Sequence, residues 1–131
     1  MSFDIFVTAF QDGKPRAFPR AMLEKAFGPL ADMSDPTWWK LKDSFAGIQV
    51  DDEAEISDFS VNRPPGDDHP FWPALLRVLD ETSSVLYWPG GGPVAVNETA
   101  AASVPPVMVK KLGAVQTVKT VAELMRLIGE S

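Results

Sequence analysis

The one histidine of the chain is the side chain best suited to proton transfer at neutral pH. His69 follows Asp67 and Asp68 and precedes a predicted helix, whose dipole disfavours the charged imidazole while the aspartates favour it. A general base also needs a nucleophile or a substrate within reach. The sequence has no GxSxG, HExxH or recognisable Ser/His/Asp series. We therefore expect no hydrolytic or transfer activity that depends on His69.

Three consecutive glycines, Gly90 to Gly92, could cradle a phosphate group in a suitable context. The lysine and the Ser or Thr of a P-loop are missing, as is the GxGxxG spacing, and an apolar run follows where a helix should begin. We interpret the glycines as a turn between two strands. An enzyme or small-ligand-binding protein with a site near Arg63, His69 and the Gly90 to Gly92 turn remains one alternative.

Four carboxylates lie close together between two predicted strands: Asp51, Asp52, Glu53 and Glu55. The alternating oxygen ligands and the central glycine of an EF-hand are absent, so the sequence predicts no metal site here. Residues 51–81 hold nine acids against two bases, and the whole chain has a net charge of −6. Such a balance repels phosphate backbones and argues against nucleic acid as a partner. It suits a basic protein partner, although solubility alone would also explain the acids.

The rest of the composition excludes several further kinds of site and of protein. Cysteine is absent, which excludes disulfides, thiolate metal sites and a cysteine nucleophile and suits a reducing cytoplasm. No apolar run approaches the roughly 20 residues of a membrane span, and the N-terminal residues do not resemble a signal peptide. We expect a cytoplasmic protein without a cofactor or a membrane partner. Among the tryptophans, Trp88 stands beside the glycine turn and is our candidate for an exposed anchor.

The residues around the glycine turn predict the element that organises the fold. Val85 to Trp88 is a β-branched and aromatic run that is apolar on both faces, and Val94 to Val96 is a second short apolar run. We predict a hairpin whose first arm is an interior strand, covered by a helix from about Pro70 to Thr82. Further strands are expected at residues 3–10, 37–42, 46–50, 56–61 and 114–118. Further helices are expected at about 19–27 and 120–129, and a short one follows Pro106 and ends at Leu112.

These elements predict one α+β domain over residues 1–131, with a mostly antiparallel β-sheet and helices packed on it. In the strand at 37–42, Lys40 and Lys42 face away from Trp39, and lysines in such positions protect the edge of a sheet from unwanted pairing. The acidic residues 51–55 are expected to form the charged tip of a hairpin.

The segments FDIFVTAFQDG, FPRAML, HPFWPALLRVL and VLYWPGGGPVAV resemble a family of small, uncharacterised bacterial proteins over nearly the whole chain. In size, acidity and α+β make-up the chain is also similar to immunity proteins that neutralise bacterial toxins. This second resemblance implies an inhibitor that binds a toxin.

We predict a non-enzymatic protein-binding domain that meets a partner with a basic surface. The predicted binding residues are Asp51, Asp52, Glu53, Glu55, Arg63, Asp67, Asp68 and Trp88. A structural or oligomerising module, in which surplus aromatic side chains form a self-interface, remains the other alternative.

Overall fold

The computed structural model describes residues 3–130, which form one α+β domain around a mixed, mostly antiparallel sheet. This arrangement confirms the predicted fold class. The strands follow the order β11-β10-β9-β1-β8-β6-β5-β4 across the sheet, with β2 added beside β1, and only β10 and β11 run parallel. The strands of this sheet are β1 (Asp4–Gln11), β2 (Lys14–Pro15), β4 (Ala31–Asp35), β5 (Trp38–Leu41), β6 (Gly47–Gln49), β8 (Asp58–Asn62), β9 (Ser84–Trp88), β10 (Gly91–Ala95) and β11 (Gln116–Thr117).

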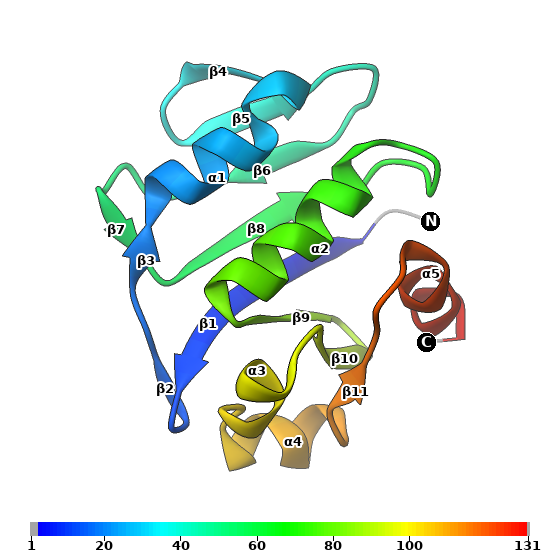
Figure 1. The fold of residues 1–131 in the computed structure, drawn as a ribbon. Coiled ribbons are helices and arrows are strands. Elements are labelled where there is room, and N and C mark those ends of the chain that lie inside the picture. Colours follow the sequence, from blue (N-terminus) through cyan, green and yellow to red (C-terminus); the bar gives the residue numbers. More distant parts are fainter. Residues whose placement is uncertain (1–2, 131) are drawn as a thin grey trace.

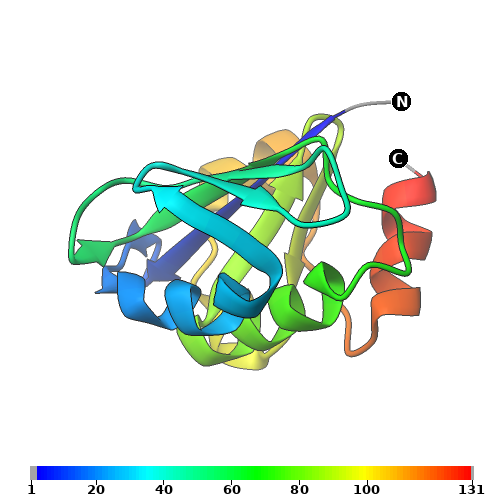
Figure 2. The same ribbon diagram turned by 90° about the horizontal axis from the view of Figure 1, so that it is seen from above.

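Two helices, α1 (Arg20–Phe27) and α2 (Phe71–Thr82), cover one face of the sheet (Figures 1 and 2). In α2, Phe71, Leu75 and Val78 recur at helical spacing and are buried. The Phe71 ring stacks on Phe27 of α1 with ring centroids 5.5 Å apart, so the two helices share one core with the sheet. Helix α2 ends at Ser83, which takes a left-handed conformation with φ of 50°.

The predicted hairpin is confirmed as β9 and β10. Strand β9 lies between β1 and β10, and its Leu86 pairs with Val7 on one side and Val94 on the other. Leu86 is fully buried in the core under α1 and α2, while Val85 is buried in a second cluster on the opposite face. Strand β9 is therefore an interior strand with an apolar layer on each face.

The second cluster comes from two short helices, α3 (Glu98–Ala102) and α4 (Pro106–Leu112). They pack against the end of the sheet that contains β9 and β10 (Figure 1). Helix α3 begins where the Asn97 side chain accepts a hydrogen bond of 2.8 Å from the Ala100 amide. Because both helices are short and lie at one end, they leave the middle of this second face uncovered.

The last helix, α5 (Val121–Glu130), begins with a capping box formed by Thr120 and Glu123. The Thr120 hydroxyl oxygen accepts a hydrogen bond of 3.1 Å from the Glu123 amide, and a Glu123 carboxylate oxygen accepts one of 3.1 Å from the Thr120 amide. Leu124, one residue later, is fully buried in the main core. The capping box therefore holds α5 where its apolar face meets the core.

One detail of the sequence prediction is wrong. Strand β5 is not an edge strand, because β4 pairs with it on the outer side. Strand β4 was not predicted because three of its five residues, Asp32, Ser34 and Asp35, are polar. The acidic segment lies at the tip of a hairpin, as predicted, because β6 and β8 pair antiparallel on either side of it. Within this tip, β7 (Glu55–Ile56) pairs with β3 (Phe18–Pro19) in a separate two-stranded sheet. A one-turn 3₁₀ helix, η1 (Gly28–Leu30), follows α1 and leads into β4.

Candidate functional site

One row of register partners crosses five strands on the face opposite α1 and α2. The row consists of Trp38, Gln49, Ser60, Phe6 and Tyr87, each paired with the next. Trp38 is paired in turn with the exposed Asp35 of β4, which lies outside the aromatic ends of this set. Side chains alternate along a strand, and the residues next to these in their strands are buried in the core: Trp39, Ile48, Phe59, Val7 and Leu86. All five members of the row are half-buried or exposed. We call this set the exposed row.

The aromatic end of the exposed row is formed by Phe6 and Tyr87. Their rings stack with centroids 5.7 Å apart and planes inclined by 24°. A groove of about 360 Å³ opens beside them, lined almost wholly by apolar side chains that include Val107 and Met108 of α4. Val107 is 58% exposed. The groove is thus an apolar recess with room for a side chain from another molecule.

A polar cavity of about 260 Å³ adjoins this groove, because Phe6 and Tyr87 line both. Asp51 and Asp58 bring two carboxylates to its wall, and Thr8 stands beside them with its hydroxyl 3.1 Å from the Tyr87 hydroxyl. Burial, and to a lesser degree the charge of Asp51, raise the pKa of Asp58 above its ordinary value. The cavity therefore favours a positive charge that would compensate the two carboxylates.

The other end of the exposed row is Trp38, which is 41% exposed. Its indole lies over Gly47, where a Cβ atom would overlap the ring. Glycine is thus required at this position so that the large aromatic side chain can lie flat against the sheet. Aromatic side chains, a residue type enriched at protein interfaces, therefore stand at both ends of the row.

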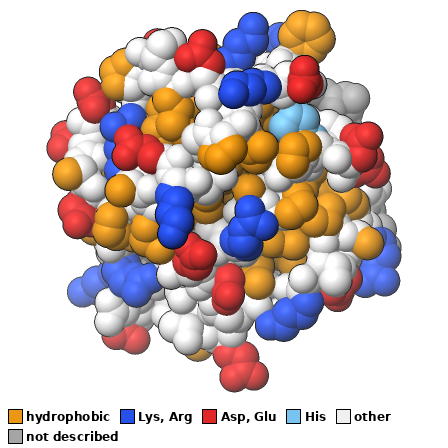
Figure 3. Space-filling model, turned by 45° about the horizontal axis from the view of Figure 1, so that its top comes forward, with side chains coloured by type: hydrophobic (Ala, Val, Ile, Leu, Met, Phe, Trp, Pro, Cys, Tyr) orange, Lys and Arg blue, Asp and Glu red, His pale blue; other side chains and the backbone are white. Residues whose placement is uncertain are grey.

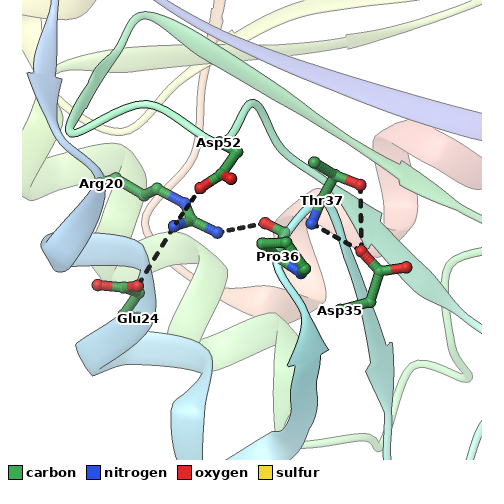
Figure 4. A network of polar contacts seen from close by, with 6 residues as sticks. All are labelled: Arg20, Glu24, Asp35, Pro36, Thr37 and Asp52. Carbon is green, nitrogen blue, oxygen red and sulfur yellow. Dashed lines mark hydrogen bonds and ion pairs between the residues drawn. The ribbon is translucent and has the colours of Figure 1, made fainter.

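The acidic segment 51–55 is exposed throughout, but its residues do not act as one cluster. Only Asp51 lines the polar cavity. A carboxylate oxygen of Asp52 lies 3.6 Å from the Arg20 guanidinium, which also pairs with Glu24 at 3.6 Å and donates a hydrogen bond to the Pro36 carbonyl oxygen (Figure 4). Asp52 therefore has a partner inside the protein, so the segment is attached to the start of α1 instead of projecting freely.

Neither Glu53 nor Glu55 lines the polar cavity or the apolar groove. Glu55 belongs to β7 and is exposed, as Glu53 is. The backbone holds the segment in place, since the Arg20 amide donates a hydrogen bond of 2.9 Å to the Ala54 carbonyl oxygen. Of the four predicted acids, Asp51 alone joins the site, and Asp58, which the sequence prediction did not include, is its partner there.

Trp88 is not the exposed anchor that the sequence predicted, because its side chain is only 4% exposed. The indole lies over Gly91, at which a Cβ would overlap the ring. The reason for the error is that Trp88 points into the main core, whereas Tyr87, one residue earlier, points to the uncovered face. The exposed tryptophan of the described residues is Trp38.

The histidine has both ring nitrogens engaged. The Phe71 amide donates a hydrogen bond of 3.0 Å to Nδ1 of His69, so Nε2 carries the proton and donates one of 2.8 Å to the Lys42 carbonyl oxygen. Figure 3 shows the histidine among hydrophobic side chains, with charged ones around them. His69 thus has a structural role, because it links the first turn of α2 to the chain that follows β5.

Two of the three parts of the alternative ligand site line neighbouring cavities, and the third lines a separate one. Arg63 lines a groove of about 1060 Å³, and His69 and Asp68 line a neighbouring cavity of about 380 Å³; both include Lys42. The turn Gly90 to Gly92 lines a third cavity, of about 220 Å³, together with Gln116 and Leu127. Asp67 is exposed.

Comparisons with known proteins give no relative from which a function could be carried over. No protein-family model, curated protein or solved structure matches the chain. Within residues 3–130, no three His, Asp or Glu side chains come together as a metal site would require. None of the helices in this range has both the length and the apolar character needed to cross a membrane.

Sequence reasoning missed Phe6, Tyr87 and Asp58 as site residues. The alternation in residues 3–10 did indicate that Phe6 and Thr8 share a face. The pattern could not predict the register that places Phe6 beside Tyr87. These two residues are separated by 80 others in the chain, and no local rule fixes the pairing of strands so far apart.

Proposed function

We propose that this protein is a binding domain that receives a segment of a protein partner across the exposed row. The observation that carries the proposal is the row itself, with stacked aromatic rings at one end, an indole at the other, and a two-carboxylate cavity beside the rings. Aromatic side chains on a partly buried, preformed surface provide large contact area at low entropic cost.

The chemistry of the face supports one kind of partner over others. The apolar groove beside Val107 suits an aromatic or aliphatic side chain, and the cavity beside Asp51 and Asp58 suits a lysine or arginine. A cation in the cavity would favour the ionised form of Asp58, so binding would strengthen as the pH rises through its titration range. We infer a basic segment that also contains a large apolar residue. An immunity-type inhibitor of a basic toxin is one member of this class.

The experiment is a selection of peptides from a random displayed library on the immobilised protein. The expected result is enrichment of sequences that combine Lys or Arg with an aromatic residue. Selected peptides should bind the double variant Asp51→Asn/Asp58→Asn at least tenfold more weakly, since two charges facing the ligand are lost. The matched control Asp67→Asn/Glu81→Gln removes two exposed carboxylates elsewhere and should keep the affinity.

Two results would contradict the proposal. One is a selection that enriches no such sequences, and the other is equal affinity of both double variants for the selected peptides. A concentration-dependent dimer that is disrupted by Phe6→Ser would instead identify a second copy of this chain as the occupant, which is the oligomerising alternative.

A further inference from the structure

Another groove shares no lining residue with the apolar groove or with the polar cavity, and in contrast to that cavity it is lined by more basic than acidic side chains. It has a volume of about 1060 Å³ and is bounded by β5, the turn that follows it, and the loop at 63–66. Three cations line it: Lys40, Lys42 and Arg63. Against them stand Asp32 and Asp43, so three positive and two negative side chains leave a net charge of +1 in a chain whose net charge is −6.

The side chains of the three cations form no salt bridge within the described residues, where the salt bridges are those of Arg20. The carboxylate of Asp32 is already engaged, because it accepts a hydrogen bond of 2.9 Å from the Ser34 amide. That bond, helped by the charges of Lys42 and Lys40, lowers the pKa of Asp32 below its ordinary value. The groove therefore has an excess of positive charge even after the interaction of the two lysines with Asp32, and the Arg63 guanidinium has no salt bridge among the described residues.

Arg63 is held in a backbone conformation that its side chain does not favour. Its φ is 52°, in the left-handed region that glycine takes freely and long side chains seldom take. No hydrogen bond or ion pair of its side chain, among residues 3–130, compensates for this conformation. Sparsely populated backbone conformations cluster at functional sites, and the residue in this one has a guanidinium that lines the groove.

An aromatic ring stands at the same groove. Phe45 lies in the turn between β5 and β6 and is 88% exposed, the highest value among the large hydrophobic side chains. Pro64 and Pro65 line the groove as well and add apolar surface. Figure 3 shows basic, acidic and hydrophobic side chains side by side at the upper edge of the molecule, near the histidine.

We propose that this groove binds a small organic anion that contains a planar ring. Its phosphate or carboxylate group is held by the Arg63 guanidinium with Lys40 and Lys42, and its ring lies against Phe45. A guanidinium binds either oxyanion through two parallel hydrogen bonds. A nucleic acid does not fit this surface, because the remaining charge of the chain repels a polyanion. This site is independent of the proposed protein-binding face.

The test is an NMR titration of the full chain with four probes: phenyl phosphate, benzoate, inorganic phosphate and benzyl alcohol. We expect saturable binding of phenyl phosphate or benzoate at millimolar concentration, with shifts concentrated in residues 40–45 and 63–66. The stronger of these two probes identifies the oxyanion. Inorganic phosphate has the oxyanion without the ring, and benzyl alcohol has the ring without the oxyanion. Each should bind at least tenfold more weakly.

Variants then separate ligand binding from folding. Arg63→Gly should weaken the best probe at least tenfold without lowering the melting temperature, because glycine adopts the observed φ without strain. Arg63→Gln, which keeps a long side chain at the same φ, should show the same loss of binding. Phe45→Ser should weaken the ring-containing probes but leave inorganic phosphate unchanged. Lys110→Gln, which removes an exposed cation from α4, is the matched control and should bind normally.

Absence of saturable binding by all four probes would overturn the proposal. So would an Arg63→Gly variant that binds as tightly as the unchanged protein. A marked fall in its melting temperature with unchanged binding would assign Arg63 to folding instead.

Discussion

Phe6 and Tyr87 are direct register partners on β1 and β9, and their rings stack on the uncovered face with centroids 5.7 Å apart. The Tyr87 hydroxyl also lies 3.1 Å from the Thr8 hydroxyl, two residues farther along β1. The pair thus joins two central strands and forms the wall shared by the apolar groove and the polar cavity. Any partner of this face would meet these two rings.

A double-mutant cycle measures how strongly the two rings interact. We expect Phe6→Ala and Tyr87→Ala to show a coupling free energy of about 0.5–1.5 kcal/mol, the usual value for a stacked aromatic pair beyond its area burial. Urea denaturation of the two single variants and the double variant gives this number. If the two single losses in the free energy of unfolding add up to that of the double variant, the rings do not stabilise one another. The wall of the groove would then not be preorganised.

Leu86→Ala tests the interior position of β9. Leu86 is fully buried between strands β1 and β10, so its truncation should reduce the free energy of unfolding by about 2–5 kcal/mol through lost transfer energy and a residual cavity. Val107→Ala, at a 58% exposed site, should change it by less than about 0.5 kcal/mol. Chemical denaturation checks both. A loss below about 1 kcal/mol for Leu86→Ala is incompatible with the core described above.

The carboxyl of Asp58 should make stability depend on pH. Its pKa in the folded state is raised above the unfolded value, so the folded state binds the proton more tightly. The free energy of unfolding should therefore fall as the pH rises from below the unfolded pKa through the raised folded pKa, and then level off. Asp58→Asn removes this loss and should be more stable near pH 7 by about 0.2–1 kcal/mol, a range suited to a partly exposed charge.

Denaturation midpoints of the unchanged protein and of Asp58→Asn, measured at a series of pH values, test this prediction. The unchanged protein and Asp58→Asn should converge in stability below the unfolded pKa of the aspartate. A difference that stays constant over the whole range would show that packing, and not ionisation, separates them.

Thr120→Ala tests how α5 is held. Losing the hydroxyl that accepts from the Glu123 amide should lower the free energy of unfolding by about 1 kcal/mol, as for other N-terminal caps. Thr99→Ala, at an exposed position in the first turn of α3, removes the same group where no such bond is made and should have little effect. Equal losses in thermal or urea unfolding would show that the cap is unimportant.

Local patterns predicted the central strands and the two longest helices because their residues follow one periodicity throughout. Phe6 and Thr8 could be placed on one face of β1, and the buried positions Leu75 and Val78 on one side of α2, from spacing alone. Strand β4 could not be predicted in this way, because its polar residues are strand only through pairing with β5.

The site was harder to predict than the fold because it depends on which of two neighbouring residues faces out. Trp88 and Tyr87 are both aromatic, and the run that contains them is apolar on both faces, so no alternation distinguishes them. The pairing of Asp52 with Arg20 could not be predicted either, since the pairing of β7 with β3 is what places these two residues near one another. Both facts follow from strand register, which long-range contacts decide.

The position of Trp38 over Gly47 has an optical consequence. The other three indoles, those of Trp39, Trp72 and Trp88, are at most 4% exposed, so water reaches them little. An aqueous quencher such as acrylamide should therefore reduce mainly the long-wavelength part of the tryptophan emission, which Trp38 provides. Because Trp38 ends the exposed row, a partner that covers this face would shield that same fraction, and quenching would report occupancy without a chemical label.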